Sequence, residues 1–202
     1  MNKLASIIHV NEEIKRIVKI SHDINMLALN AIILSYQAGG CAVGFGVIAN
    51  ELRLFSKTLS DVMRSLMELS YAAVATTSEQ QKRIRLGYLL DKAYEKAQQL
   101  SLNSESKLKL ENSLKLKNMG SFQATPQRIN DERNSALLHR LLSDAQEIGR
   151  FGCIISRSLK IEATYTGDFR EILSQIALSF ADYIDKIPLH LSYIQEQLRG
   201  SA

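Results

Sequence analysis

The side chains that could carry acid–base, nucleophilic or metal chemistry are few and lie far apart in the sequence. They are four histidines and two cysteines: His9, His22, His139, His190, Cys41 and Cys153. There is no His-x-x-x-His pair, no Glu-x-x-His and no Cys-x-x-Cys, the spacings that bring metal ligands together. We therefore predict no metal site, no cofactor and no catalytic residues, with the histidines on helix surfaces or seams.

Cys41 lies in the glycine-rich stretch G-G-C-A-V-G that begins at Gly39. This stretch lacks the Lys-Ser/Thr that follows a phosphate-binding loop. An exposed thiol at this place could act as a redox sensor, but no Lys, Arg or His stands near it in sequence to favour the thiolate. The sequence thus favours a binding or signalling protein over an enzyme.

The composition favours long helices. The chain has 202 residues, 46% of them hydrophobic and 23% charged, which is enough for one substantial core or two small ones. Two prolines and no tryptophan argue against a sandwich or barrel, in which turns recur every ~8–12 residues. We predict an all-α fold, and the mild net charge of +4, spread along the chain, gives no reason to expect a nucleic-acid partner.

The N-terminal stretch does not resemble a signal peptide, because Asn11, Glu12 and Glu13 end its short apolar run without a small-residue cleavage site. The longest apolar stretch, residues 26–34, is interrupted by Asn30 and is shorter than the ~20 residues that span a bilayer. Cysteines without a disulfide pattern fit a reducing compartment. We expect a soluble, cytoplasmic protein with no transmembrane segment.

The first hundred residues have the pattern of a helical hairpin. Apolar and small residues recur at 3-4 spacing on the outgoing arm, the seam of a coiled coil: Ile7, Val10, Ile14, Ile17, Ser21, Ile24, Ala28, Ala31, Ser35 and Ala38. Gly39, Gly40 and Gly44 then permit a sharp reversal of the chain. The same spacing resumes on the returning arm: Phe45, Ile48, Leu52, Phe55, Leu59, Val62, Leu66, Leu69, Ala73 and Thr76. We predict an antiparallel hairpin over residues 1–100, with its tip near residues 39–44.

Residues 101–125 are rich in Ser, Asn and Lys, contain Gly120 and show no helical stripe, which indicates a polar, basic linker. Within it, K-L-K-L-E-N-S-L-K-L-K alternates lysine with leucine. This segment could be a small β-hairpin, a basic strip that touches acidic lipid, or a solvated connector. Thr125 and Pro126 are a plausible cap and first residue of the next helix.

Residues 126–202 have the pattern of a second hairpin with its tip near Gly167. Its outgoing seam is predicted to contain Leu138, Leu141, Ala145, Ile148, Gly152, Ile155, Leu159, Glu162 and Thr166. Its returning seam is predicted to contain Phe169, Leu173, Ile176, Phe180, Tyr183, Ile187 and Ile194, with a kink at Pro188. The stretch from Ser158 to Gly167 aligns without gaps with that from Asn30 to Gly39, which indicates a diverged internal repeat.

Three stretches of the first hairpin carry a resemblance to a known family: I-N-M-L-A-L-N-A-I-I from Ile24, A-G-G from Ala38, and G-F-G-V-I-A-N-E-L-R from Gly44. They resemble the signalling domain of methyl-accepting chemotaxis proteins, the bacterial chemoreceptors. The family pattern is N-x-L-A-L-N-A-x-I-E-A-A-R-A-G-E, followed by G-x-G-F-A-V-V-A-x-E-V-R. The resemblance extends from about residue 14 to residue 62.

The resemblance implies a four-helix bundle and a set of partners. In that family two hairpins pair as a dimer, the tips gather into trimers, and an adaptor protein and a histidine kinase dock beside the tip. This chain carries two hairpins, so a single molecule could form the coiled-coil four-helix bundle, and we expect a monomer. The implied partners are the chemotaxis adaptor and histidine kinase, and also chemoreceptors themselves.

The resemblance also assigns residues to the docking surface. Met26, Leu29 and Asn30 on the outgoing arm and Val47 on the returning arm take the positions that face the adaptor. The alternative is that Leu29 and Val47 pack inside the bundle. The charged tip residues of the family are replaced by Leu34, Gln37 and Gly40, while the second tip keeps a family-like glutamate, Glu162.

Three functions follow as hypotheses. The first is chemotaxis-type signal transduction by a receptor-like module that docks the adaptor and kinase through its tip. The second is a structural, scaffolding coiled-coil protein derived from a chemoreceptor, without kinase control. The third is a helical bundle that holds a small ligand or haem, for which the sequence shows no cavity.

Overall fold

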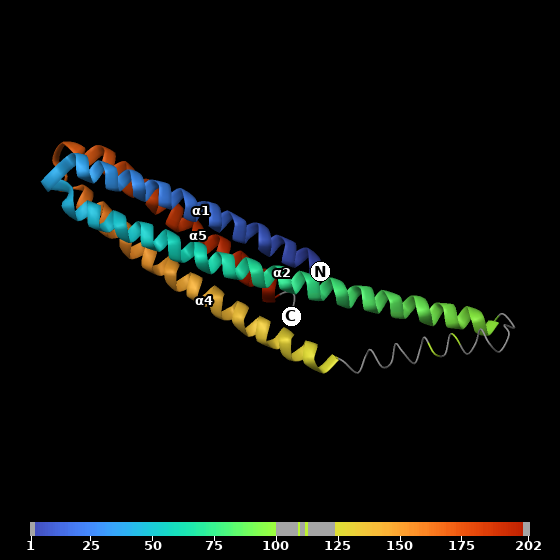
Figure 1. Cartoon of the computed structure of the whole chain (residues 1–202). Helices are drawn as coiled ribbons and strands as arrows, with labels where there is room; N and C mark the ends of the chain where they lie inside the picture. Colours follow the sequence, from blue (N-terminus) through green and yellow to red (C-terminus); the bar gives the residue numbers. More distant parts are fainter. Residues whose placement is uncertain (1–2, 100–108, 110–111, 113–123, 200–202) are drawn as a thin grey trace. The chain divides into compact units, whose positions relative to one another are not determined.

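The computed structural model describes residues 3–99, 109, 112 and 124–199 of the chain. The helices are α1 (Lys3–Ala38), α2 (Val43–Gln99), α4 (Ala124–Ala163) and α5 (Arg170–Arg199). Two short 3-10 helices, η1 (Gly39–Ala42) and η2 (Gly167–Phe169), form the turns (Figure 1). The described residues contain helices and turns and no strand, which confirms the predicted all-α fold of long helical hairpins.

The chain divides into two compact units, which we describe separately. The first consists of Met1–Ser70 together with Leu138–Ala202, and the second is Tyr71–Leu137. This division differs from the boundaries that composition suggested, 1–100, 101–125 and 126–202. The two hairpins share a unit because the apolar stripe of each is covered only when the other packs against it.

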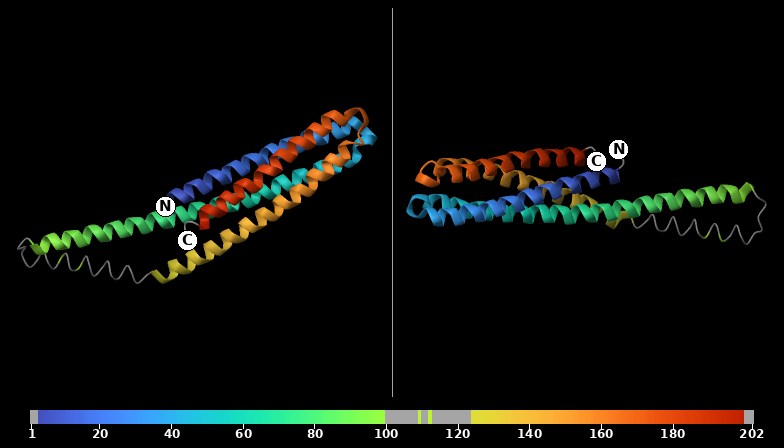
Figure 2. Two further views of the ribbon diagram at one scale, coloured as in Figure 1. Left: turned by 180° about the vertical axis from the view of Figure 1, so that it is seen from behind. Right: turned by 90° about the horizontal axis from the view of Figure 1, so that it is seen from above.

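The first unit is a four-helix bundle. Its two turns lie at the same end, and the start of α1 and the end of α5 lie at the other (Figure 2). Helices α1 and α4 therefore run toward the turns, while α2 and α5 run away from them. Helix α5 continues through Pro188, the position of the predicted kink, as one helix.

The core of this bundle contains residues of all four helices, and apolar stripes at helical spacing account for it. Its fully buried large side chains are Phe45, Phe180, Ile14, Ile17, Ile24, Leu52, Leu59, Met63, Leu66, Leu142, Leu159 and Leu173. The rings of Phe55 and Phe180 meet edge to face in this core, with centroids 5.9 Å apart and planes at 88°.

Buried positions of the two hairpins correspond at a constant separation, which supports the internal repeat. On the outgoing arms the separation is 128 residues, and both members of each pair are buried: Ile14 and Leu142, Ile17 and Ala145, Ser21 and Gly149, Ile24 and Gly152, Ala31 and Leu159. On the returning arms it is 124 residues: Ala49 and Leu173, Leu52 and Ile176, Met63 and Ile187.

The predicted seams are displaced by one residue at several positions. Ala49 and Met63 are buried on α2, where Ile48 and Val62 were expected and are only half-buried. On α4 and α5, Leu142, Gly149, Ala163 and Ile184 are buried in place of Leu141, Ile148, Glu162 and Tyr183. The physical reason is that a bundle helix packs on two neighbours, so its buried stripe is wider than a two-stranded seam.

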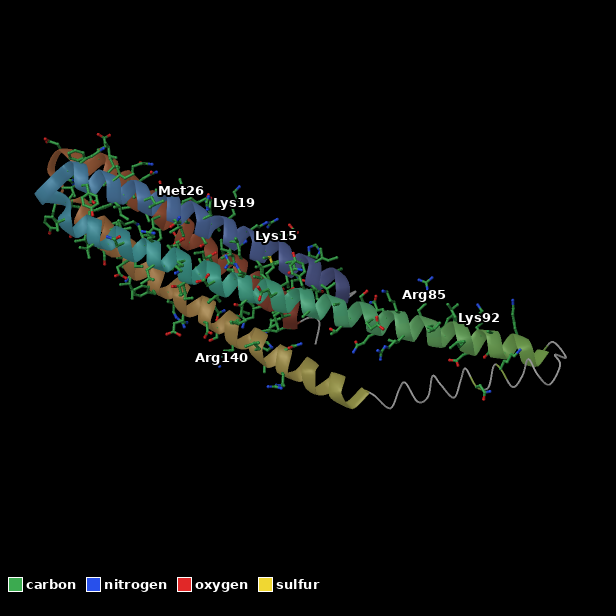
Figure 3. The ribbon with its side chains drawn as sticks, in the orientation of Figure 1. Lys15, Lys19, Met26, Arg85, Lys92 and Arg140 are labelled. Carbon is green, nitrogen blue, oxygen red and sulfur yellow. The ribbon has the colours of Figure 1, made fainter. Side chains whose placement is uncertain are left out.

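The second unit contains the distal part of α2 and the first part of α4. Large apolar side chains of α2 are exposed here, among them Ile84 and Tyr88, and the ammonium of Lys92 lies 5.8 Å from the Tyr88 ring centroid. Figure 3 marks Arg85 and Lys92 on this part of α2. Helix α4 begins at Ala124, two residues before the predicted start of the second hairpin.

Most of the predicted linker, residues 101–125, lies outside the described residues. Lys109 and Asn112 are described and both are helical. The β-hairpin reading of the K-L-K-L segment is therefore wrong at these two positions. The readings as a lipid-binding strip or a solvated connector stay predictions.

One helical stretch, Ala5–Ala93, contains a window of 18 residues with a mean hydropathy of 1.6. By length and composition alone this window could cross a membrane. The core helix of a water-soluble protein passes the same test. The expectation that the chain has no transmembrane segment stays a prediction.

Candidate functional site at the hairpin tips

The two tips are built in the same way around a left-handed glycine. Gly39 has a φ of +66° and Gly167 a φ of +58°, and a 3-10 turn begins at each. A side chain at such a φ clashes with its own backbone, so glycine is the residue that lets each helix reverse. Gly40 and Gly44, the other predicted turn residues, do not have left-handed φ values.

The tips of the two hairpins contact each other. The carboxylate of Glu162, near the end of α4, lies over Gly44 at the start of α2, where a Cβ on Gly44 would be 1.7 Å from Glu162 Oε1. The Cys41 thiol lies 3.0 Å from the carbonyl oxygen of Ala38 and 3.7 Å from that of Thr166. The missing side chain at Gly44 thus leaves space for the acidic residue of the other tip.

Of the residues that the resemblance assigns to docking, Val47 lies in the first turns of α2, beside the tip, while Met26, Leu29 and Asn30 lie about two to three turns before the end of α1. Met26 on α1, marked in Figure 3, and Val47 on α2 are exposed, with 48% and 59% of their surface accessible. Asn30 is exposed as well, whereas Leu29 is half-buried. Val47 therefore does not pack inside the bundle, which removes that alternative for this residue.

Val47 lines an apolar groove beside the first tip, which we call the tip groove. It has a volume of about 310 Å³ and is lined by Ile32, Ser35, Tyr36, Gly39, Val43, Gly46, Val47 and Asn50. Its rim is strongly exposed, with 82% of Tyr36 and 64% of Val43 accessible. A Cβ on Gly46 would lie 2.7 Å from Ser35 Oγ, so the glycine keeps the arms close together beneath the groove.

Asn30 belongs to a different groove, between α1 and α5. This groove has a volume of about 650 Å³ and is lined by Asn30, Ile33, Leu34, Gln37, Glu171, Ile172, Gln175 and Ile176. Met26, Asn30 and Ile33 share the outward face of α1, since they are spaced by three and four residues. The structure therefore places the predicted docking residues around two grooves and the α1 face between them.

Sequence reasoning missed Tyr36, Val43 and Ile33, each of which is exposed and lines one of these grooves. Their positions in the sequence could have indicated this, because they lie off the apolar seam. A large apolar side chain there does not enter the core and stays exposed. The second tip presents the same kind of residue, with Ile161, Tyr165 and Ile172 exposed.

The grooves at the tips have the form of surfaces that bind another protein. Among the described residues, no group of three or more His, Cys, Asp or Glu side chains is placed to hold a metal ion. Shallow apolar grooves rimmed by aromatic and aliphatic side chains are typical of protein–protein docking surfaces.

Comparison with known proteins shows a similarity to a chemoreceptor. The chain is 37% identical over 67 residues to a probable chemoreceptor, y4sI, of Sinorhizobium fredii, a match that covers 33% of this chain and 8% of the relative. The chain is thus chemoreceptor-like over a third of its length and spans only a small part of that relative. No family model matches it, and no solved structure matches it.

Proposed function

We propose that this chain acts in chemotaxis-type signal transduction as a receptor-like module whose tip docks the chemotaxis adaptor protein and histidine kinase. The observation that carries the proposal is the 37% identity with a probable chemoreceptor. The module acts in the cytoplasm by binding rather than by catalysis. Exposure of Met26 and Val47, the residues that the resemblance assigns to the docking surface, supports the proposal.

Apolar contact supplies the affinity in this mode of docking. The charged tip residues of the family are replaced by Leu34, Gln37 and Gly40, so charge pairing at these positions is not available. The tip groove instead offers Tyr36, Val43 and Val47 around a concave surface. A partner side chain that enters this groove removes its apolar rim from water, at about 25 cal/mol per Å² of buried apolar surface.

The bundle of this chain is complete without a second molecule. The buried positions of the two hairpins cover each other, as the two chains of a receptor dimer do in the family that the sequence resembles. The module therefore presents its tip to the adaptor as a single chain. Chemoreceptors are further partners, since their tips bind the same proteins.

The test measures binding of a purified chemotaxis adaptor to the full chain by isothermal titration calorimetry. Val47→Glu should weaken binding at least tenfold, because a carboxylate on the groove rim must be desolvated without a partner. Ile154→Glu is the matched control, since Ile154 on α4 is also 59% exposed but does not line the tip groove. It should leave the affinity unchanged.

Circular dichroism must show that both variants keep the helical content of the parent. Adaptor binding that is equal in the parent and Val47→Glu would contradict docking through the tip groove. If the parent binds neither adaptor nor kinase, the signalling role fails and the scaffolding reading takes its place.

A further inference from the structure

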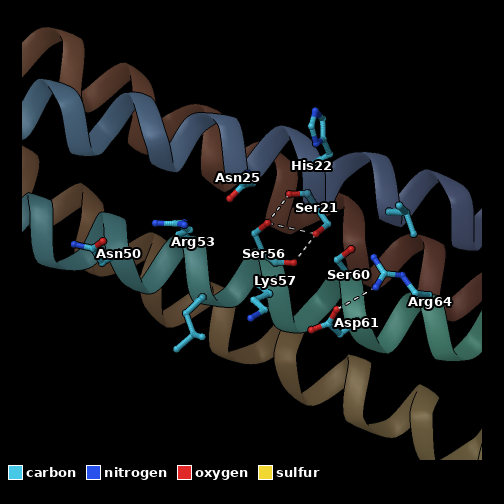
Figure 4. A pocket seen from close by; sticks show the side chains of 12 residues that line it. Ser21, His22, Asn25, Asn50, Arg53, Ser56, Lys57, Ser60, Asp61 and Arg64 are labelled. Carbon is cyan, nitrogen blue, oxygen red and sulfur yellow. Dashed lines mark hydrogen bonds and ion pairs between the residues drawn. The ribbon is translucent and has the colours of Figure 1, made fainter.

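A third groove lies farther from the tip, between α1 and α2, and it is polar and basic. It has a volume of about 750 Å³ and is lined by Val18, Ser21, His22, Asn25, Asn50, Arg53, Leu54, Ser56, Lys57, Ser60, Asp61 and Arg64 (Figure 4). We call it the basic groove. It holds three permanently cationic side chains and one carboxylate.

Two of its cations lack a carboxylate partner among the described residues. Arg64 is 3.8 Å from Asp61, the carboxylate of the groove. No ion pair joins Arg53 or Lys57 to any acidic side chain in the part of the chain that the structure describes, and both are exposed. The groove therefore carries excess positive charge over several turns of α2.

The floor of the groove is closed by two buried serines that hold the arms together. Ser21 Oγ donates a hydrogen bond to the carbonyl of Ser56 at 2.6 Å, and Ser56 Oγ donates to the carbonyl of Ser21 at 2.7 Å (Figure 4). Small residues at this crossing let α1 and α2 approach, so the longer side chains beside them form the walls. The two arms are thus fixed to each other at the floor of the groove by hydrogen bonds.

Helix α5 carries the complementary surface, which we call the acidic row. All four of its carboxylates lie in a narrow arc opposite its buried stripe, interleaved with two exposed leucines: Glu171, Leu178, Asp182, Asp185, Leu189 and Glu196. Asp182 pairs with Lys186 one turn on, and this carboxylate raises the pKa of the lysine. Asp185 and Glu196 have no ion-pair partner among the described residues.

The spacing of charges on the two surfaces agrees. Eleven residues, about three helical turns, separate Arg53 from Arg64 in the basic groove. The same interval separates Glu171 from Asp182, and Asp185 from Glu196, in the acidic row. Leu54, exposed in the groove, provides an apolar contact for Leu178 or Leu189 of the row.

Most of these charges are not common to the two hairpins. At the repeat separation of 124 residues, the groove cations Arg53, Lys57 and Arg64 correspond to Ala177, Ala181 and Pro188 of α5. In the opposite direction, Glu171, Asp182 and Glu196 correspond to Val47, Thr58 and Ala72 of α2, whereas Asp185 corresponds to another aspartate, Asp61 of the basic groove. The two hairpins therefore differ in charge at most of these positions, and the groove and the row lie on different faces of the bundle.

We infer that the basic groove of one molecule receives the acidic row of α5 from a second copy of this chain. The contact is heterologous, because groove and row are different surfaces, so each molecule can bind one copy at the groove and another at the row. It joins bundles that are already complete. Most of the binding energy comes from exposed charges. The association is therefore weak, and its affinity falls with added salt.

Sedimentation velocity of the full chain tests this inference. At low salt the average mass should rise with protein concentration, and at ~1 M NaCl, where the Debye length is about 3 Å, it should return to that of the monomer. Arg53→Glu/Lys57→Glu and Asp185→Lys/Glu196→Lys should each weaken association at least tenfold. An equimolar mixture of these two variants should associate again, because opposite charges then face each other.

Lys82→Glu/Arg85→Glu on the distal part of α2 is the control, since it changes net charge by the same amount as the groove variant and should associate like the parent. Circular dichroism checks the fold of every variant. A parent that stays monomeric at all concentrations in low salt, or variants that associate as the parent does, overturns the inference. A mixture of the two charge variants that stays monomeric also overturns the inference. Binding of the groove to vesicles of anionic lipid, without self-association of the chain, overturns it as well.

Discussion

Glu13 Oε2 on α1 lies 2.6 Å from His190 Nδ1 on α5, a hydrogen bond that joins the two hairpins across 177 residues of sequence. The other carboxylate oxygen accepts a bond of 2.7 Å from Arg16 Nη1. Glu13 is buried, while its neighbour Glu12 is exposed and pairs with Lys15 on the same helix. Adjacent glutamates on one helix thus have different roles, since only Glu13 faces another helix.

Glu13→Ala should lower the free energy of unfolding by about 1.5–3 kcal/mol, because a charged group that is hydrogen-bonded across the bundle is removed and His190 loses its partner. Glu12→Ala should leave the melting temperature unchanged, since an exposed pair within one helix is screened by solvent. Thermal unfolding followed by circular dichroism measures both. Equal shifts of the melting temperature in the two variants would show that the hydrogen bond between Glu13 and His190 does not stabilise the bundle.

The positive φ of Gly39 predicts a cost for any side chain at this position. Gly39→Ala should destabilise the hairpin by about 1–2 kcal/mol, the strain of a left-handed non-glycine residue. Gly40→Ala is the matched control, because Gly40 lacks a left-handed φ and a Cβ there would meet nothing within 4 Å. It should be neutral or slightly stabilising in urea unfolding. A larger loss of unfolding free energy for Gly40→Ala than for Gly39→Ala would show that the chain reversal depends on Gly40 and not on Gly39.

Two glycines three residues apart on α4 should respond with opposite sign. A Cβ on Gly152 would lie 2.5 Å from Ile184 Cδ1 and 2.9 Å from Phe55 Cε2, so Gly152→Ala should destabilise by about 1–3 kcal/mol through overpacking. A Cβ on Gly149 would lie 3.8 Å from Ile187 Cγ2, an ordinary contact. Gly149→Ala should therefore stabilise by roughly 0.5–1 kcal/mol through helix propensity. Chemical denaturation of both variants measures the difference, and equal signs would argue against close packing at Gly152.

Tyr36 should act as an anchor if the tip groove docks an adaptor. Tyr36→Ala should weaken adaptor binding at least tenfold, because aromatic side chains at the centre of an interface carry much of its energy. Tyr71→Ala, at an exposed tyrosine of the second unit, should not change binding. Surface plasmon resonance with immobilised adaptor compares the two, and an equal loss in both would point to a general effect of removing a surface aromatic.

Apolar periodicity predicted much of this fold, because helical amphipathicity is a local property of the chain. The 3-4 spacing of Ile14, Ile17 and Ile24 was sufficient to predict α1, and glycines at the ends of two such stripes predicted the turns. The seam residues were predicted less accurately. Ile48 was expected in the core, but its neighbour Ala49 is the buried residue. Periodicity gives the direction of a helix face only to within about one residue, and the neighbouring helices decide which side chain enters the core.

The docking surface was predicted only in part. Met26 and Val47 came from resemblance to a family, and the structure exposes both. Tyr36 and Val43 were missed, because their exposure depends on where α1 and α2 separate at the tip. The Glu162 carboxylate over Gly44 was also not predictable, since the two residues lie 118 positions apart and no local pattern connects them.

The sequence by itself determined the helices, their reversal at Gly39 and Gly167, and the relation to a chemoreceptor, because each depends on residues close together in the chain. Only the tertiary structure decided that the two hairpins share one core and which of their faces stay exposed. The reason is that burial depends on the surfaces that meet, and contacts such as Phe55 with Phe180 join residues that no periodicity relates. The basic groove and the acidic row likewise became recognisable as surfaces only once packing had turned those side chains away from the core.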